Sequence, residues 1–148
     1  SNAQFPILVT YTNIIHDTKK AINKIRNLKE KNPRISNAYL NSIGNITNKA
    51  KLDLIEGKSK KIGALMNQNH RLLEKLRISN ETISEIREIA LKNGAWGSKL
   101  TGAGLGGCVI SIGKRSKLEN INSILSQEGF KGFITDINKK GVQIEKKR

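Results

Sequence analysis

One segment of this 148-residue sequence has residue types and a spacing that could serve chemistry: the glycine run at 99–108, KLTGAGLGGC. Glycine has no Cβ and adopts positive φ readily, so a dense run lets a phosphate or another backbone approach closely. Gly102, Gly104 and Gly107 have the GxGxxG spacing of a dinucleotide site. That site needs a helix directly after the glycines, whereas the strand-like run CVISI follows here. A dinucleotide site is therefore excluded.

Two interpretations of the glycine run remain. It can be a plain hairpin connection between two strands, although a tight hairpin needs only one or two glycines. The excess of glycine otherwise indicates close approach by another backbone or a ligand. On the second interpretation, at least two of the glycines should have positive φ, the set being Gly102, Gly104, Gly106 and Gly107.

The elements that must position this run are predicted from the period of the apolar residues. Strand-like runs occupy five segments: 5–12, 95–101, 108–112, 130–137 and 142–144. Helical spacing extends from an N-cap at Asp17 or a neighbour to Pro33, from there to near Gly57, over 62–76, from Ser79 or Asn80 to Gly94, and from Ser116 to Gly129. Strands and helices are partly segregated along the chain. The order predicts an α+β fold in which helices cover an antiparallel sheet.

The charge of the chain is strongly positive. It has 27 Lys and Arg against 12 Asp and Glu, a formal net charge of +15. Such a balance is typical of nucleic-acid-binding domains. However, no aromatic residues are interleaved with the basic ones as a stacking platform, and no helix-turn-helix or zinc-finger motif is present. We interpret the charge as a solvated surface and retain a nucleic-acid-binding module as an alternative.

Other residue types exclude several classes of protein. No apolar run approaches the roughly 18 residues of a membrane span, which argues against a membrane protein. The single cysteine, Cys108, excludes an intramolecular disulfide and suits a cytoplasmic location. The two histidines, His16 and His70, lie far apart and do not indicate a metal site; His70 is interpreted as a helix residue that makes hydrogen bonds.

The two ends of the domain are also predicted. Residues 1–3, Ser-Asn-Ala, are typical of the remnant of a cleaved purification tag. The only methionine, Met66, is internal, and residue 4 leads directly into an apolar run. We therefore expect residues 4–148 to be one domain of a longer protein.

The glycine run resembles a known motif. KLTGAGLGGC is similar to the third conserved motif of the GHMP kinases, and most of all to its version in the mevalonate kinases of that family. Residues 66–70, MNQNH, with Leu72-Leu73 resemble the helix that precedes it, and LVT at 8–10 with DTK at 17–19 resembles the entry into the same domain. The three matches follow the family's order and spacing over nearly all of 4–148.

The resemblance implies the C-terminal domain of a two-domain kinase, with a ferredoxin-like antiparallel sheet under helices. In the family, ATP and substrate bind between the domains, and the catalytic and Mg-binding side chains lie in the N-terminal half. No catalytic or metal-binding residue is therefore expected in this chain. The residues expected to face the phosphate loop or the substrate cleft are His16, Asp17, Thr18, Thr101, Gly102, Ala103, Gly104, Gly106 and Gly107.

The resemblance further implies that the intact enzyme transfers the γ-phosphoryl group of ATP to mevalonate, with Mg as a second cofactor. The missing N-terminal domain would be the partner of this chain, which alone should be inactive. Phosphomevalonate kinase and homoserine kinase share the scaffold, and we retain both as alternative identities of the intact enzyme. A homodimer is also retained as an alternative. Leu105 stands where the family usually has glycine, which implies a negative φ or an altered loop, and His16 stands where arginine is frequent. A Cβ at Gly104 is expected to press on the phosphate loop.

Overall fold

The computed structural model describes residues 5–15 and 17–137. The tag-like residues 1–3, His16 and the strand expected at 142–144 lie outside the described residues. The elements, in chain order, are β1 (Pro6–Tyr11), α1 (Thr18–Lys31), α2 (Pro33–Ile55), α3 (Ser59–Lys75), α4 (Glu81–Lys92), β2 (Gly97–Thr101), β3 (Cys108–Ile112), α5 (Arg115–Gln127) and β4 (Gly132–Asp136).

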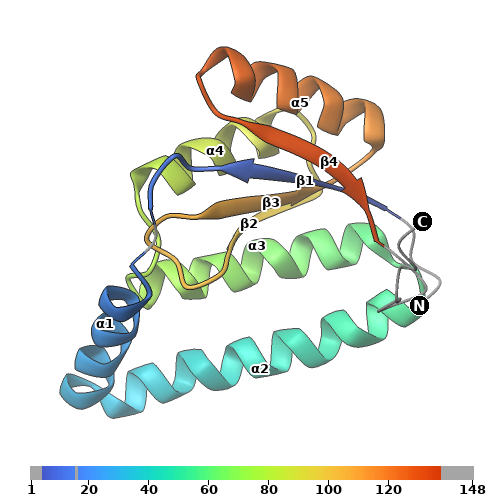
Figure 1. The fold of residues 1–148 in the computed structure, drawn as a ribbon. Helices are drawn as coiled ribbons and strands as arrows, with labels where there is room; N and C mark the ends of the chain where they lie inside the picture. Colours follow the sequence, from blue (N-terminus) through green and yellow to red (C-terminus); the bar gives the residue numbers. More distant parts are fainter. Residues whose placement is uncertain (1–4, 16, 138–148) are drawn as a thin grey trace, which may run out of the picture.

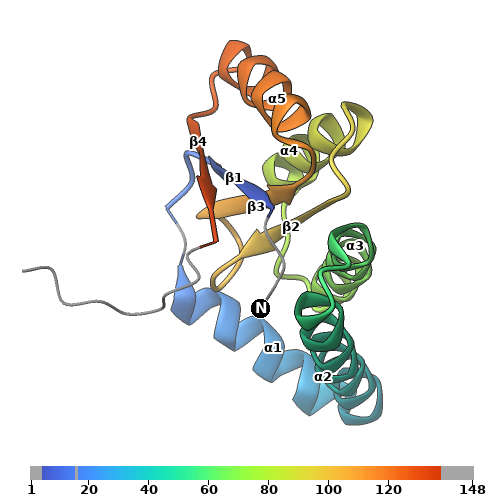
Figure 2. The same cartoon turned by 90° about the vertical axis from the view of Figure 1, so that its right-hand side faces the viewer.

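The four strands form one antiparallel sheet in the order β2-β3-β1-β4. Four helices separate β1 from β2, and α5 lies between β3 and β4. This connectivity, together with the strand order β2-β3-β1-β4, is that of a ferredoxin-like fold. α4 and α5 cover one face, α3 runs along the edge at β2, and α1 and α2 extend away from the sheet (Figures 1 and 2). The predicted α+β fold with a helix-covered antiparallel sheet is confirmed.

The main core lies between the sheet and the helices α4 and α5. Strand residues that point to this face, Leu8 and Val109 among them, pack against Ile83, Ile86 and Ile121 of the helices. All of these side chains are fully buried. A second cluster around Phe5, Ile62 and Ile112 joins α3 to the sheet, and a third around Ala21, Leu76 and Ile78 joins α1 to the end of α3.

Helix boundaries follow the local sequence closely. The Asp17 carboxylate accepts a hydrogen bond from the Lys20 amide at 2.9 Å, and the Asn80 side chain accepts one from the Ile83 amide at 2.9 Å. These are N-caps, and each satisfies one of the amides that the first turn of α1 or α4 leaves unpaired, as the sequence predicted. The strand expected from residue 95 begins instead at Gly97, because the Ala95 amide still donates to α4.

Backbone meets backbone where α3 crosses the start of β2. A Cβ built on Gly63 would lie 2.6 Å from the carbonyl carbon and oxygen of Trp96, and one on Gly97 would collide with the backbone of Gly63. Neither position has room for a side chain. Two glycines thus bring α3 close enough for its polar side chains to reach the backbone of β2.

Substitution of these glycines tests the contact. Gly97→Ala should lower the free energy of unfolding by about 1–3 kcal/mol or more, because its methyl group overlaps backbone that cannot move aside. Gly44→Ala in α2 is the matched control: a Cβ there has nothing within 4 Å, so a gain of about 0.5–1 kcal/mol is expected. Denaturant unfolding measures both variants, and equal stabilities would contradict the close approach.

Candidate functional site

The glycine run forms the connection between β2 and β3, at the end of the sheet beside the start of α1 (Figure 1). All four glycines have positive φ: 86° at Gly102, 88° at Gly104, 155° at Gly106 and 81° at Gly107. The expectation that at least two would do so is confirmed. The strand pairing ends at Thr101 and Cys108, so the loop between them makes no ladder bonds.

Leu105 also has positive φ, at 60°. The alternative expected from the sequence, a negative φ at this position, is wrong. A leucine in the left-handed region costs about 1–2 kcal/mol relative to glycine, so contacts around it must hold the conformation. Its side chain packs in the cluster of Ala21, Leu76 and Ile78. Burial of the leucine side chain offsets the backbone strain.

One side of the loop is fastened to the α3–α4 connector, residues 76–80. The Leu105 amide donates to the Ile78 carbonyl oxygen at 2.8 Å. A Cβ on Gly104 would collide with that same oxygen. The expectation that a Cβ at Gly104 would press on a phosphate loop is therefore corrected, since it would first strike the domain's own connector. Gly104 is a glycine because of packing inside this chain.

The other side of the loop is fastened to the turn that follows β1. The Gly107 amide donates to the Ile14 carbonyl at 3.0 Å, while the Thr12 amide and hydroxyl both donate to the Gly107 carbonyl, at 2.9 and 3.0 Å. A Cβ on Gly106 would lie 2.7 Å from the Ile14 carbonyl oxygen. Gly106 is thus also held against the chain's own backbone.

Gly102 differs from the glycines that follow it. It is exposed, and among the described residues nothing lies within 4 Å of the position its Cβ would take. Thr101 is exposed and Ala103 is half-buried, whereas Gly104 and Gly106 are buried. The structure therefore divides the predicted site residues: Thr101 and Gly102 are exposed, Ala103 packs partly against the α1 cluster, and Gly104 and Gly106 shape the loop from inside.

The start of α1 lies beside this loop because Ala21 packs in one cluster with Ala103 and Leu105. Asp17 and Thr18, both exposed, belong to the first turn of α1. The Asp17 carboxylate already accepts the Lys20 amide as a helix cap, so one of its oxygens is engaged. His16 lies outside the described residues.

A cavity of about 360 Å³ opens between α2, α3 and the end of β2. Its walls are mostly apolar, with Ile43, Leu65 and Met66 contributing, and its polar groups include Lys99 and Thr101. Burial lowers the pKa of Lys99, and no acidic side chain lies on the described wall. An ammonium group partly removed from water without a carboxylate partner favours an anion nearby.

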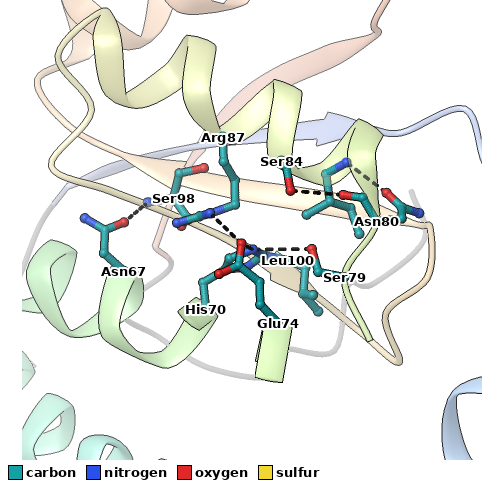
Figure 3. Close-up of polar contacts among 10 residues, drawn as sticks. Asn67, His70, Glu74, Ser79, Asn80, Ser84, Arg87, Ser98 and Leu100 are labelled. Atoms are coloured by element: carbon teal, nitrogen blue, oxygen red, sulfur yellow. Dashed lines mark hydrogen bonds and ion pairs between the residues drawn. The ribbon is translucent and has the colours of Figure 1, made fainter. Parts of the chain in front are cut away.

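Polar side chains of α3 and α4 cover the free edge of β2 (Figure 3). Asn67 accepts from the Ser98 amide at 3.0 Å and donates to the Trp96 carbonyl at 3.2 Å. His70 Nδ1 accepts from the Leu100 amide at 3.3 Å, and Arg87 Nε donates to the Ser98 carbonyl at 2.9 Å. Side chains thus replace the neighbouring strand that an edge strand lacks. Sequence reasoning missed this role, and the only local signal was the helical i, i+3 spacing of Asn67 and His70.

The His70 imidazole is fully buried and neutral. Burial, and after it the positive charges of Arg87 and Lys99, lower its pKa to about 3. Because Nδ1 accepts the Leu100 amide, the proton of the neutral ring is on Nε2. Nε2 lies 3.3 Å from Glu74 Oε1 and 3.4 Å from Ser79 Oγ, and either oxygen can accept a hydrogen bond from Nε2–H.

Neither cysteine chemistry nor metal binding is indicated by the described side chains. Burial raises the pKa of the Cys108 thiol, which opposes thiolate formation. No group of three or more His, Cys, Asp or Glu within residues 5–15 and 17–137 could hold a metal ion. In the same part of the chain, no helix has both the length and the apolarity that crossing a membrane requires.

Comparison with known proteins identifies the class. A model of the C-terminal domain of the GHMP kinases matches residues 50–131, more than half of the chain. The chain belongs to this family. Within it, the chain is similar to mevalonate kinases: it is 35% identical over 147 residues to that of Thermococcus sibiricus and 37% identical over 150 residues to that of Pyrococcus abyssi. These alignments cover 96% and 98% of this chain but 44% of each relative.

Solved structures agree with this assignment. A Methanococcus jannaschii mevalonate kinase is 28% identical with a TM-score of 0.70, over 90% of this chain and 40% of that one. An L. major mevalonate kinase in complex with R-mevalonate shares the fold, with a TM-score of 0.82 at 23% identity over 88% of this chain and 42% of that one. The chain spans less than half the length of the relatives it matches. Membership of this family disfavours the nucleic-acid-binding alternative.

The titration of His70 predicts a pH dependence of stability. The unfolded chain binds a proton at His70 near pH 6.5, whereas the folded state resists it down to about pH 3, so acid favours unfolding in this window. His70→Asn keeps an acceptor but does not titrate. The stability advantage of the wild type over His70→Asn should therefore shrink as the pH falls from 7 to 4.5. Urea unfolding at both pH values measures it; an unchanged difference would mean that His70 titrates equally in both states.

Proposed function

We propose that residues 4–148 are the C-terminal domain of a mevalonate kinase, which transfers the γ-phosphoryl group of ATP to mevalonate. The observation that carries the proposal is the exposed start of the glycine loop, Thr101 and Gly102, in a chain similar to mevalonate kinases over nearly its whole length. The remaining loop residues are fastened on two sides, so the exposed part is presented in a fixed position.

The role of this domain in the transfer would be to form one wall of the cleft and to brace the phosphate loop. Phosphoryl transfer depends mainly on the position of the reacting groups and on electrostatic stabilisation. Gly102 offers a surface without a Cβ on which a loop of the N-terminal domain can rest. Thr18 and Asp17 would line the same cleft from the start of α1, and His16 precedes them in the sequence.

ATP and Mg would be held by the N-terminal domain. The described residues contain no metal-ligand cluster, and the glycine loop leads into a strand instead of a helix, so within 5–15 and 17–137 we assign no site to either group. We therefore assign no Mg-binding or ATP-binding role to these residues. Lys99, beside Thr101 in the apolar cavity, adds a positive charge to the same side of the loop.

A reconstitution experiment tests the proposal. The 148-residue chain alone should neither bind MgATP in the micromolar range nor release ADP with mevalonate, because a cleft with one wall leaves the phosphates in water. Addition of the separately expressed N-terminal half should produce ADP release. Phosphomevalonate and homoserine serve as competing acceptors, since a phosphomevalonate kinase from Streptococcus pneumoniae shares the fold, with a TM-score of 0.78 at 20% identity. Turnover by the chain alone, or preference for either competing acceptor, would contradict it.

Gly102→Ala in the intact enzyme tests the contact with the phosphate loop. The methyl group meets nothing in this domain, so stability should fall only by the left-handed strain of about 1–2 kcal/mol. Activity should fall more than tenfold if another loop rests there. Gly57→Ala is the matched control, since Gly57 has φ of 73° and equally open surroundings in the α2–α3 connection. Similar kinetics for the two variants would show that Gly102 meets no partner.

A further inference from the structure

Two segments that hold the glycine loop meet at one side chain. β2 leads directly into the loop, and the Leu100 amide, two residues before Gly102, donates to His70 Nδ1. The α3–α4 connector holds the loop at Leu105 through the Ile78 carbonyl. Ser79, the next residue of that connector, has its hydroxyl 3.4 Å from His70 Nε2. One imidazole therefore joins the strand that enters the loop to the segment that braces it.

We propose that His70 is a positioning residue for the phosphoryl transfer, because it sets the distance between the end of β2 and the α3–α4 connector. This proposal rests on the proposed function. With both segments held, the Ile78 carbonyl stands where the Leu105 amide can donate to it. The exposed residues Thr101 and Gly102 are then held in one position relative to the N-terminal domain. His70 acts through the loop and touches no substrate.

Backbone strain on both sides of the Ile78 contact supports this role. Arg77, which precedes the acceptor Ile78, has φ of 61°, and the donor Leu105 has φ of 60°, so a left-handed residue other than glycine stands on each side of that hydrogen bond. Such conformations persist only where surrounding contacts hold them. The Ile78 amide holds the connector to α3 through the Leu73 carbonyl, and the Ser79–His70 contact adds a second attachment one residue further along.

The imidazole suits this role because its two nitrogens have opposite hydrogen-bonding roles. Nδ1 accepts from β2, and Nε2–H donates toward the connector and toward Glu74. His70 is fully buried, so water does not replace either partner. Figure 3 shows His70 beside Leu100, Ser79 and Glu74, with Arg87 reaching the Glu74 carboxylate from α4. Arg87 Nη1 lies 3.5 Å from Glu74 Oε1, and this ion pair holds the carboxylate near the imidazole ring of His70.

Amide hydrogen exchange in the 148-residue chain tests the mechanical part. His70→Asn keeps an acceptor for Leu100 and loses the Nε2 contact, and Ser79→Ala loses the same contact from the other side. Each should lower the protection of the Leu105 amide at least tenfold. The Gly107 amide, which is held by Ile14 on the opposite side, should change less than twofold. The double variant should be no worse than either single one, since both remove one interaction.

A matched control separates positioning from general loss of stability. Ser111→Ala removes a buried hydrogen bond of 2.9 Å to Ser98 without touching the connector. In this variant, any change in hydrogen-exchange protection should be equal at the Leu105 and Gly107 amides. Equal losses at Leu105 and Gly107 in His70→Asn would reduce His70 to a structural residue and overturn the proposal.

Kinetics of the intact enzyme test the catalytic consequence. His70→Asn and Ser79→Ala should each lower kcat at least tenfold while the KM values for ATP and mevalonate change less than threefold, because the loop is misplaced while the binding groups remain. An unchanged kcat in a variant whose Leu105 amide has lost hydrogen-exchange protection would overturn the proposal. If the enzyme phosphorylates a different acceptor, the proposed function fails on its substrate, and the kcat comparison made with that acceptor still decides the role of His70.

Discussion

Pairing of the backbone groups along the free edge of β2 is the constraint on which the functional end of this domain depends. A buried amide or carbonyl without a partner costs about 1–3 kcal/mol, and β2 has no strand on its outer side. Asn67 and His70 of α3 and Arg87 of α4 take the place of that strand. Because β2 continues into the glycine loop, the same side chains fix where the loop begins.

Close packing makes this arrangement possible. Gly63 and Gly97 let the backbone of α3 touch that of β2, which places the short side chain of Asn67 within reach of two backbone groups. Longer side chains at the two glycines would move the helix outward and leave these groups unpaired. The glycines of α3 and β2 therefore serve the polar contacts as much as the packing.

The glycine loop combines two uses of the same residue type. Gly104 and Gly106 lack a Cβ because the domain's own carbonyls, those of Ile78 and Ile14, occupy the space. Gly102 lacks one where the described residues leave the space open. A motif that resembles a ligand-binding loop thus packs largely against the backbone of its own domain. Only the residues near Gly102 are exposed. This division explains how a loop can be both rigid and accessible.

Much of the fold could be predicted from the sequence alone, because local rules decide it. The caps at Asp17 and Asn80, the strand CVISI and the positive φ of the loop glycines each depend on a few adjacent residues. The family was also recognisable, from three short motifs. The tertiary structure alone decided which glycine faces outward, that Leu105 takes positive φ, and that His70 is buried and neutral. These features depend on Ile78, Ile14 and Leu100, which approach the loop or the helix from distant parts of the chain. A residue's local sequence carries no signal for a carbonyl or an amide that only the folded chain brings against it.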